Sequence, residues 1–267
     1  ASLEVNPHLA RDTQGTISEA RRLYDLMGRP NVMIKVPATP EGIPAIRQLI
    51  SDGINVNVTL IFSAKTYADV REAYISGLEA FSRSGGDPST VSSVASFFIS
   101  RVDTAVDAAI GEAVDAGNTI LGSLISKAAI SNARVAYQEF GRSFGEDRFV
   151  TLQEEGALVQ RPLWASTSTK NPELSDVLYV EELIGPDTVN TLPDATLEAF
   201  LDHGTAQQTL DADIEDAADT LFAIDSAGIK MDDITDKLLK DGLKLFADSY
   251  DEVVADVDRK RASLVRG

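Results

Sequence analysis

The sequence has no cysteine, and its only histidines are His8 and His203, among 267 residues. Without cysteine the chain can form neither a disulfide framework nor a thiolate metal site. The two histidines share no local spacing, so a histidine-based metal site or a Ser-His-Asp triad is poorly supported. The lack of cysteine fits a cytoplasmic protein, and we expect that location.

Basic residues are also scarce. There are 24 lysines and arginines against 42 acidic residues, and the net charge is −18. Such an excess of negative charge argues against a surface for nucleic acid or for an anionic membrane. The sequence shows no signal-peptide pattern and no apolar stretch of membrane-spanning length. We therefore expect neither nucleic acid nor a membrane as a partner, and a pocket for an anionic substrate must be locally basic.

Short apolar segments alternate with helical patterns along most of the chain. Strands are expected near residues 2–5, 32–36, 54–62, 91–100, 163–165 and 188–191. Consecutive helices follow from residue 194, and nothing resembles the glycine-rich turn of a dinucleotide-binding fold. This order predicts an α/β fold, and a (β/α)8 TIM-type barrel fits it better than an open sheet. We expect a single domain over residues 1–267.

The most distinctive strand is Val32-Met-Ile-Lys-Val36, which carries Lys35 in an apolar run bounded by Pro30 and Pro37. A continuous run of this kind suits a strand that is buried on both faces. Burial disfavours a charged ammonium group, and a neutral lysine amine forms Schiff bases with carbonyl compounds. The alternative is a structural lysine that pairs with a carboxylate or extends to the rim of the barrel.

Three polar side chains on predicted strands could assist such a reaction. Glu4 and Thr59 could orient and deprotonate a water molecule, and Asn57 could bind a substrate hydroxyl or the imine nitrogen. They would converge in a barrel, because the C-terminal ends of its strands line the active site. The alternatives are a surface carboxylate for Glu4 and hydrogen bonding between strands for Asn57 and Thr59.

A second group of residues suits a phosphate. Arg101 lies just past its strand at a helix start, where guanidinium and helix N–H groups both bind phosphate oxygens. Ser168 and Lys170 follow the next strand, in the place where barrels often bind a phosphate. The alternatives are an arginine on a helix surface and a solvated loop lysine.

Five segments resemble the transaldolase family. They are Ser2-Leu-Glu-Val5, Val32-Met-Ile-Lys-Val-Pro-Ala-Thr39, Asn55-Val-Asn-Val-Thr-Leu-Ile-Phe-Ser63, Ser96-Phe-Phe-Ile-Ser-Arg101 and Trp164-Ala-Ser-Thr-Ser-Thr-Lys-Asn-Pro172. The resemblance covers essentially the whole chain, and the loop around Lys170 is most similar to the bacterial branch with an extended C-terminal half. It implies a class I Schiff-base enzyme of the pentose phosphate pathway that needs no metal or organic cofactor. Such an enzyme binds sugar phosphates and moves a dihydroxyacetone unit from sedoheptulose 7-phosphate to glyceraldehyde 3-phosphate, giving erythrose 4-phosphate and fructose 6-phosphate.

The resemblance also implies roles for individual residues. Lys35 matches the Schiff-base lysine, Glu4 and Thr59 match the pair that handles the catalytic water, and Asn57 and Ser96 match contacts to the substrate and the imine. The roles at the phosphate end fall to three other residues.

Arg101 matches a phosphate-binding arginine, and Ser168 matches a serine of the phosphate loop. Lys170 departs from the pattern, because many relatives have a second phosphate-binding arginine there. Lysine keeps the charge but loses the bidentate fork, so the resemblance implies less about phosphate affinity at this position.

A larger departure concerns the start of the chain. Transaldolases begin with two further barrel strands, which carry an aspartate for proton transfer and a Thr-Ser-Asn-Pro-type motif that binds substrate. We find neither and expect an incomplete barrel with two exposed sheet edges and poor turnover. Two other functions stay open: a fructose 6-phosphate aldolase-like Schiff-base enzyme, and a catalytically impaired barrel fragment that binds sugar phosphates.

Overall fold

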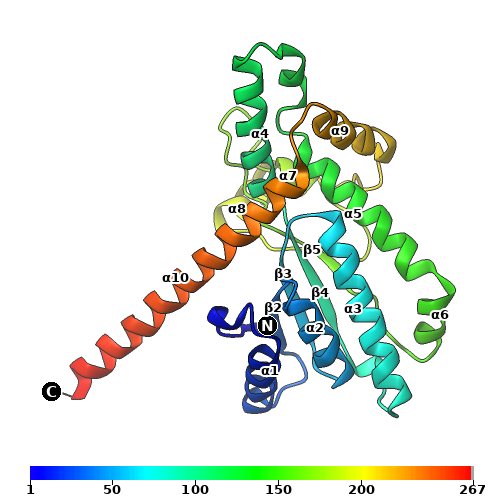
Figure 1. Ribbon diagram of the computed structural model, residues 1–267, viewed down its shortest axis with the longest axis vertical. Helices are drawn as coiled ribbons and strands as arrows, with labels where there is room; N and C mark the ends of the chain where they lie inside the picture. Colours follow the sequence, from blue (N-terminus) through cyan, green and yellow to red (C-terminus); the bar gives the residue numbers. More distant parts are fainter. Residues whose placement is uncertain (266–267) are drawn as a thin grey trace.

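The computed structural model describes residues 1–265, in which six strands form one parallel sheet (Figure 1). Each strand pairs with the next along the chain, in the order β1-β2-β3-β4-β5-β6. The strands are β1 (Ser2–Glu4), β2 (Met33–Pro37), β3 (Val56–Ile61), β4 (Ser93–Phe98), β5 (Arg161–Ala165) and β6 (Val189–Asn190). The predicted strands and the strand–helix alternation are thus confirmed.

Helices connect the strands and continue beyond the last one. The α-helices are α1 (Thr13–Met27), α2 (Gly42–Ser51), α3 (Ala64–Arg83), α4 (Ser100–Asp115), α5 (Ala128–Gly145), α6 (Asp147–Glu154), α7 (Leu178–Glu181), α8 (Asp194–His203), α9 (Ile214–Ser226) and α10 (Met231–Val265). Three short 3-10 helices are η1 (Pro7–Leu9), η2 (Pro88–Thr90) and η3 (Thr119–Leu124). No helix among residues 1–265 is both long enough and apolar enough to span a membrane.

Side chains of the sequence itself set several helix ends. The Asp12 carboxylate accepts the N–H of Gly15 at 2.9 Å and so caps α1, which ends at Gly28 with a left-handed φ of 53°. The Ser63 hydroxyl accepts the N–H of Thr66 at 3.1 Å and caps α3 in the same way.

The two faces of the sheet differ in polarity, because successive side chains of a strand point to opposite sides. Ile34, Val36, Val56 and Val58 lie in the hydrophobic core together with residues of α2 such as Leu49. The opposite face of the same strands carries the polar candidates. The period of two therefore separates the core from the candidate site.

The sheet is open within residues 1–265, because β1 and β6 each pair with only one neighbour. The parallel order and the many helices agree with a TIM-type α/β fold. A closed ring of eight strands is not found among the described residues.

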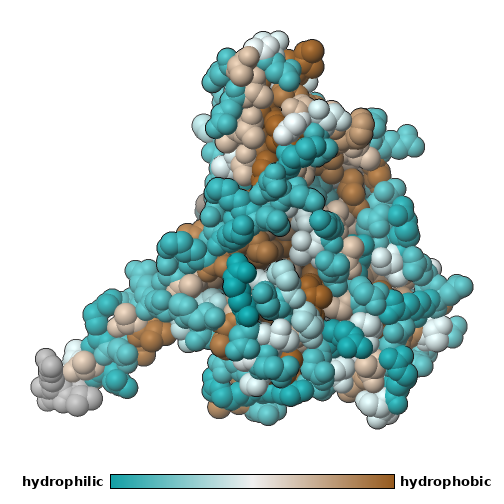
Figure 2. Space-filling view, in the orientation of Figure 1, coloured by the Kyte–Doolittle hydropathy of each residue, from teal (hydrophilic) through white to brown (hydrophobic). Residues whose placement is uncertain are grey.

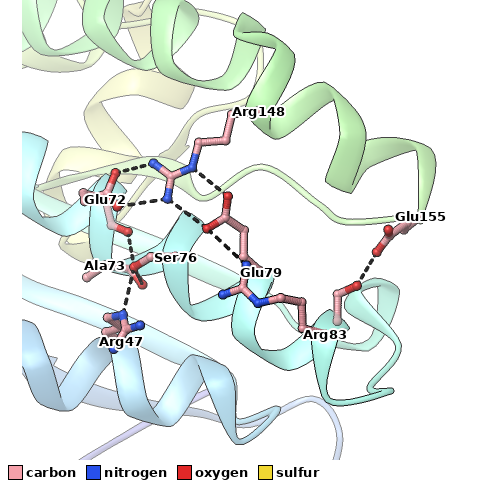
Figure 3. A network of polar contacts seen from close by, with 9 residues as sticks. Arg47, Glu72, Ala73, Ser76, Glu79, Arg83, Arg148 and Glu155 are labelled. Carbon is pink, nitrogen blue, oxygen red and sulfur yellow. Dashed lines mark hydrogen bonds and ion pairs between the residues drawn. The ribbon is translucent and has the colours of Figure 1, made fainter.

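One helix was not predicted, and ion pairs join it to the rest of the fold. Arg148 of α6 binds Glu72 and Glu79 of α3, with its Nη1 2.6 Å from one carboxylate and its Nε 2.7 Å from the other (Figure 3). These hydrogen bonds raise the pKa of the Arg148 guanidinium. Helix α6 is only eight residues long, and a helix of that length is marginal by itself, so contacts with the rest of the fold stabilise it.

Helix α10 crosses the molecule diagonally, and its C-terminal part projects away from the sheet (Figure 1). It approaches β3 closely at Gly242, where an added Cβ would lie 2.9 Å from the Leu60 side chain. Near the chain start, His8 Nε2 lies 2.8 Å from the Asp251 carboxylate. The visible face of α10 is largely hydrophilic, as is most of the surface in Figure 2.

Candidate active site

Three candidate residues lie in register across the first three strands. Glu4 of β1 is opposite Lys35 of β2, and Lys35 is opposite Asn57 of β3. Residues opposite each other in adjacent parallel strands point to the same face of the sheet. Segments far apart in the sequence therefore bring a carboxylate, an amine and an amide side by side.

The Lys35 amine forms an ion pair with Glu4, whose Oε1 lies 2.6 Å from Nζ. The Lys35 side chain is 23% exposed and that of Glu4 is 45% exposed. The Lys35 side chain is therefore only partly shielded from water, and less so than a strand that is buried on both faces would make it. Within residues 1–265 no further strand flanks β1, which leaves the pair open on that side.

A ring from α10 also lies close to this amine. The Phe246 ring centroid is 5.4 Å from Lys35 Nζ, which is within the range of a cation–π interaction. Phe246 is itself half-buried and packs against the core. The sequence pattern places it on an apolar helix stripe and gives no sign of this contact.

The buried amide of Asn57 connects three strands. Its Nδ2 donates to Ser2 Oγ at 2.9 Å, and its Oδ1 accepts from Ser96 Oγ at 2.7 Å. Hydrogen bonding between strands, the alternative role for Asn57, is thus present. It also fixes the amide and the Ser96 hydroxyl on the same face as Lys35.

Thr59 lies one pleat further along β3 and is almost fully buried. Its Oγ1 has no hydrogen-bond partner among residues 1–265. Directly after it the pairing with β4 shifts between Val58 and Ile61, and Leu60 has a positive φ of 59°. Bulges of this kind redirect side chains and are common beside active sites.

Asn55 does not belong to this polar face, although the sequence pattern groups it with Asn57 and Thr59. It lies before β3 and donates to the carbonyl of Pro30 at 2.9 Å, while its Oδ1 accepts the N–H of Ser92 at 2.7 Å. Asn55 therefore connects the loops before β2 and β4, which lie at the N-terminal ends of these strands. Asn55 lies outside the strand, because β3 begins only at Val56.

A pocket of about 460 Å³ lies at the start of α4. Its lining includes Ser100, Arg101, Thr104, Ser166 and Lys170. Helix α4 begins without a side-chain cap, although the N–H of Ser100 donates to the carbonyl of Ser166 at 3.0 Å and that of Val102 to the carbonyl of Ile99 at 2.9 Å. An uncapped helix N-terminus beside two cations is suited to bind an anion.

In the part of the chain that the structure describes, the two cations of this pocket form no ion pair, although Asp241, which pairs with Lys237, also lines the pocket. Neither Arg101 nor Lys170 has a carboxylate within 4.0 Å among residues 1–265, where most other basic side chains have one. Arg101 lies 5.2 Å from the ring centroid of Phe98, and Lys170 Nζ donates to Ser168 Oγ at 2.7 Å. Ser168 thus contacts the pocket through Lys170 and does not line it.

Helix α10 joins the two parts of the site. Leu238, Gly242 and Leu245 line the pocket of Arg101, and Phe246 contacts Lys35. Neither α10 nor Ser166 is predicted from the sequence to belong to the site. For Ser166 a signal was available, since it belongs to the hydroxyl-rich loop after β5, where its backbone adopts a φ of 58°.

Asp103 connects α4 to α5 and α7 by hydrogen bonds. Its Oδ1 accepts the N–H of Ala129 at 2.7 Å, and its Oδ2 accepts the hydroxyl of Tyr179 at 2.8 Å. Burial raises the pKa of the Asp103 carboxyl to about 6, against the effect of these two hydrogen bonds. No group of three or more His, Asp or Glu side chains within residues 1–265 is arranged to hold a metal ion.

Comparisons with known proteins agree with this geometry. Residues 1–257 match the model of the family described as Transaldolase/Fructose-6-phosphate aldolase. A transaldolase of Acidothermus cellulolyticus is 48% identical to this chain, over 100% of the chain and 71% of the relative. A transaldolase of Thermobifida fusca is 47% identical over 98% of the chain and 71% of the relative, and one of Trichodesmium erythraeum is 44% identical over 97% and 70%. The chain therefore belongs to the transaldolase/fructose-6-phosphate aldolase family.

Proposed function

We propose that this chain is a transaldolase that moves a dihydroxyacetone unit from sedoheptulose 7-phosphate to glyceraldehyde 3-phosphate in the cytoplasm. The observation that carries the proposal is the register of Glu4, Lys35 and Asn57, which sets a lysine amine between a carboxylate and an amide. The family membership and the names of the relatives support the same activity.

Lys35 supplies the nucleophile in this mechanism. The carboxylate of Glu4, 2.6 Å away, takes a proton from the ammonium, and the neutral amine adds to the C2 carbonyl of the ketose. The resulting carbinolamine loses its hydroxyl as water when Glu4 returns that proton. The product is a protonated imine between Lys35 and the sugar.

The neighbours of Lys35 hold the other reacting groups. The free hydroxyl of Thr59 holds the water molecule that leaves and later returns. Asn57 and Ser96 bind the substrate hydroxyl and the imine nitrogen from a fixed position, because they are hydrogen-bonded to each other at 2.7 Å. A fixed pair loses little conformational freedom when the substrate binds.

The pocket of Arg101 binds the phosphate of the sugar. Arg101, Lys170 and the uncapped start of α4 supply positive charge, and Ser166 and Ser168 supply hydroxyl donors nearby. In a chain with a net charge of −18, cations that are free of acidic partners mark a place for an anionic ligand. The sheet that connects the two parts is, on this proposal, part of a (β/α)8 barrel in one domain.

The experiment is reductive trapping. The chain is incubated with fructose 6-phosphate and borohydride, and the modified peptide is mapped by mass spectrometry. We expect a dihydroxyacetone adduct on Lys35 and none in the Lys35→Ala variant, with Lys65→Ala as a matched control on an exposed lysine. An unmodified wild-type chain that still binds the sugar phosphate would instead indicate a binding protein without Schiff-base chemistry.

A fructose 6-phosphate aldolase-like activity is the second candidate, because the description of the matching family includes it. The two activities differ in what happens to the three-carbon unit. A transferase keeps it on Lys35 until an aldose phosphate arrives, whereas an aldolase releases it. Turnover with and without erythrose 4-phosphate separates them, and rates equal to those of the relatives would refute the expectation of poor turnover.

A further inference from the structure

We infer that Phe246 of α10 is a positioning residue that covers the Lys35 adduct and keeps water from it, so that the three-carbon unit is transferred and not released. This inference rests on the transaldolase activity proposed above. It assigns to α10, which carries none of the residues so far given a chemical role, control over the fate of the covalent intermediate.

The first observation is the position of the ring. Its centroid lies 5.4 Å from Lys35 Nζ, while the Glu4 carboxylate is 2.6 Å from the same atom. The amine is a cation in the resting state, and the protonated imine formed from it is a cation too. The face of the ring therefore stabilises both.

The second observation is the close seating of α10 on β3. Gly242 lies against Leu60, and a Cβ at position 242 would be 2.9 Å from Leu60 Cδ2 and 3.7 Å from Phe62 Cζ. Phe246 is four residues further along the helix, so it lies on the same face one turn later. Glycine at position 242 thus allows α10 to pack close enough to β3 for the Phe246 ring to approach the Lys35 amine.

The third observation is the exposure of the amine. The Lys35 side chain is 23% exposed even with the ring in place, and the side of Glu4 is open at β1. Phe246 and its helix are the cover that the described residues place over this atom. Removal of the ring would leave the adduct accessible from both sides.

The reaction that the ring opposes is simple hydrolysis. A proton adds to the nucleophilic carbon of the enamine, which gives the protonated imine of dihydroxyacetone. Water then adds to the imine carbon, the carbon–nitrogen bond breaks, and free dihydroxyacetone leaves with Lys35 restored as an amine. Transfer uses the same enamine but joins its carbon to the aldehyde of the acceptor before hydrolysis.

The test compares release with transfer. Wild type and the variants Phe246→Ala, Phe246→Leu and Phe246→Tyr are given fructose 6-phosphate with and without erythrose 4-phosphate, and dihydroxyacetone and sedoheptulose 7-phosphate are measured. Val257→Ala serves as the control, since Val257 is 62% exposed on the same helix and lies outside the site.

We expect Phe246→Ala to raise the ratio of release to transfer about tenfold or more, which corresponds to a loss of about 1.4 kcal/mol of discrimination. Phe246→Tyr should restore the wild-type ratio because it keeps the ring, and Phe246→Leu should fall between them because it keeps the cover without the ring. The imine lifetime, followed by borohydride quenching at successive times, should shorten in the same order.

Two results would overturn the inference. One is an unchanged ratio of release to transfer in Phe246→Ala, with both rates either kept or lowered equally, because it indicates that the ring only supports the fold. The other is a ratio in Phe246→Ala that falls, because it indicates that the ring does not protect the adduct from water. A wild-type chain that traps no imine contradicts the proposed function instead. The two failures are therefore distinguishable.

Discussion

Asp103 should make this protein less stable as the pH rises from about 5 to 7.5, contrary to the usual effect of a carboxylate. Burial raises the pKa of its carboxyl from 3.8 to about 6 in the folded chain, while the unfolded chain keeps the ordinary value. Between these values the folded state binds more protons than the unfolded state. The stabilisation is therefore complete below the unfolded pKa and is lost as the pH rises through about 6.

The pKa values give the magnitude. The full difference corresponds to about 3 kcal/mol, at about 1.4 kcal/mol for each pKa unit. About half of it, about 1.4 kcal/mol, falls between about pH 5 and pH 7.5. That window is the practical one, since the isoelectric point of about 4.4 favours association at lower pH.

The variant Asp103→Asn isolates this contribution. Asparagine can accept the N–H of Ala129 and donate to the oxygen of Tyr179, so both contacts survive while the charge is gone. Urea unfolding of both proteins at several pH values should show that the variant gains about 1.4 kcal/mol relative to wild type between pH 5 and pH 7.5. If the two curves run parallel over that range, Asp103 ionises normally and the reasoning from burial fails.

Three further changes test other parts of the structure. Arg101→Ala should raise KM for phosphorylated donors about tenfold or more in steady-state kinetics, because the phosphate contact is lost. The borohydride adduct should still form at saturating donor. Equal KM values for wild type and variant would show that Arg101 does not bind the phosphate. Lys170→Arg should lower the same KM a few-fold, because the guanidinium adds a bidentate contact, and a raised KM would contradict that role. Arg148→Ala should cost about 1 kcal/mol of unfolding free energy in low salt and less in about 0.5 M NaCl, since its ion pairs with Glu72 and Glu79 are partly exposed; a loss that salt does not change would indicate packing instead of charge.

Local signals were sufficient to predict most of the elements. Asp12 and Ser63 cap the helices that follow them, and a cap of this kind depends on residues only three positions apart. The apolar run around Lys35 and the alternation around Asn57 predicted β2 and β3 for a similar reason, since both patterns have the period of a strand. For these elements, the sequence within a few residues is sufficient to predict the structure.

The contacts that define the site are not encoded in that way. The ion pair of Lys35 with Glu4 depends on the register of β1 against β2, and a shift by one residue would turn Glu4 to the other face. The bulge at Leu60 is equally invisible, because leucine has no preference for a positive φ and the surrounding sheet imposes it. The residue types identify the candidate site residues, and the register of the strands determines which of these residues lie side by side.

Helix α10 shows the limit of pattern reasoning most clearly. The period of its apolar residues predicts that one face is buried, and the face does pack on the core through Leu238, Leu239 and Leu243. A periodic stripe does not specify what it packs against, because any apolar surface would satisfy it. The absence of a side chain at Gly242 narrows the choice, since it allows an approach to Leu60 that a larger residue would prevent. The position of Phe246 over Lys35 follows from that approach, so a residue that reads as ordinary core in the sequence comes to lie against the reacting amine.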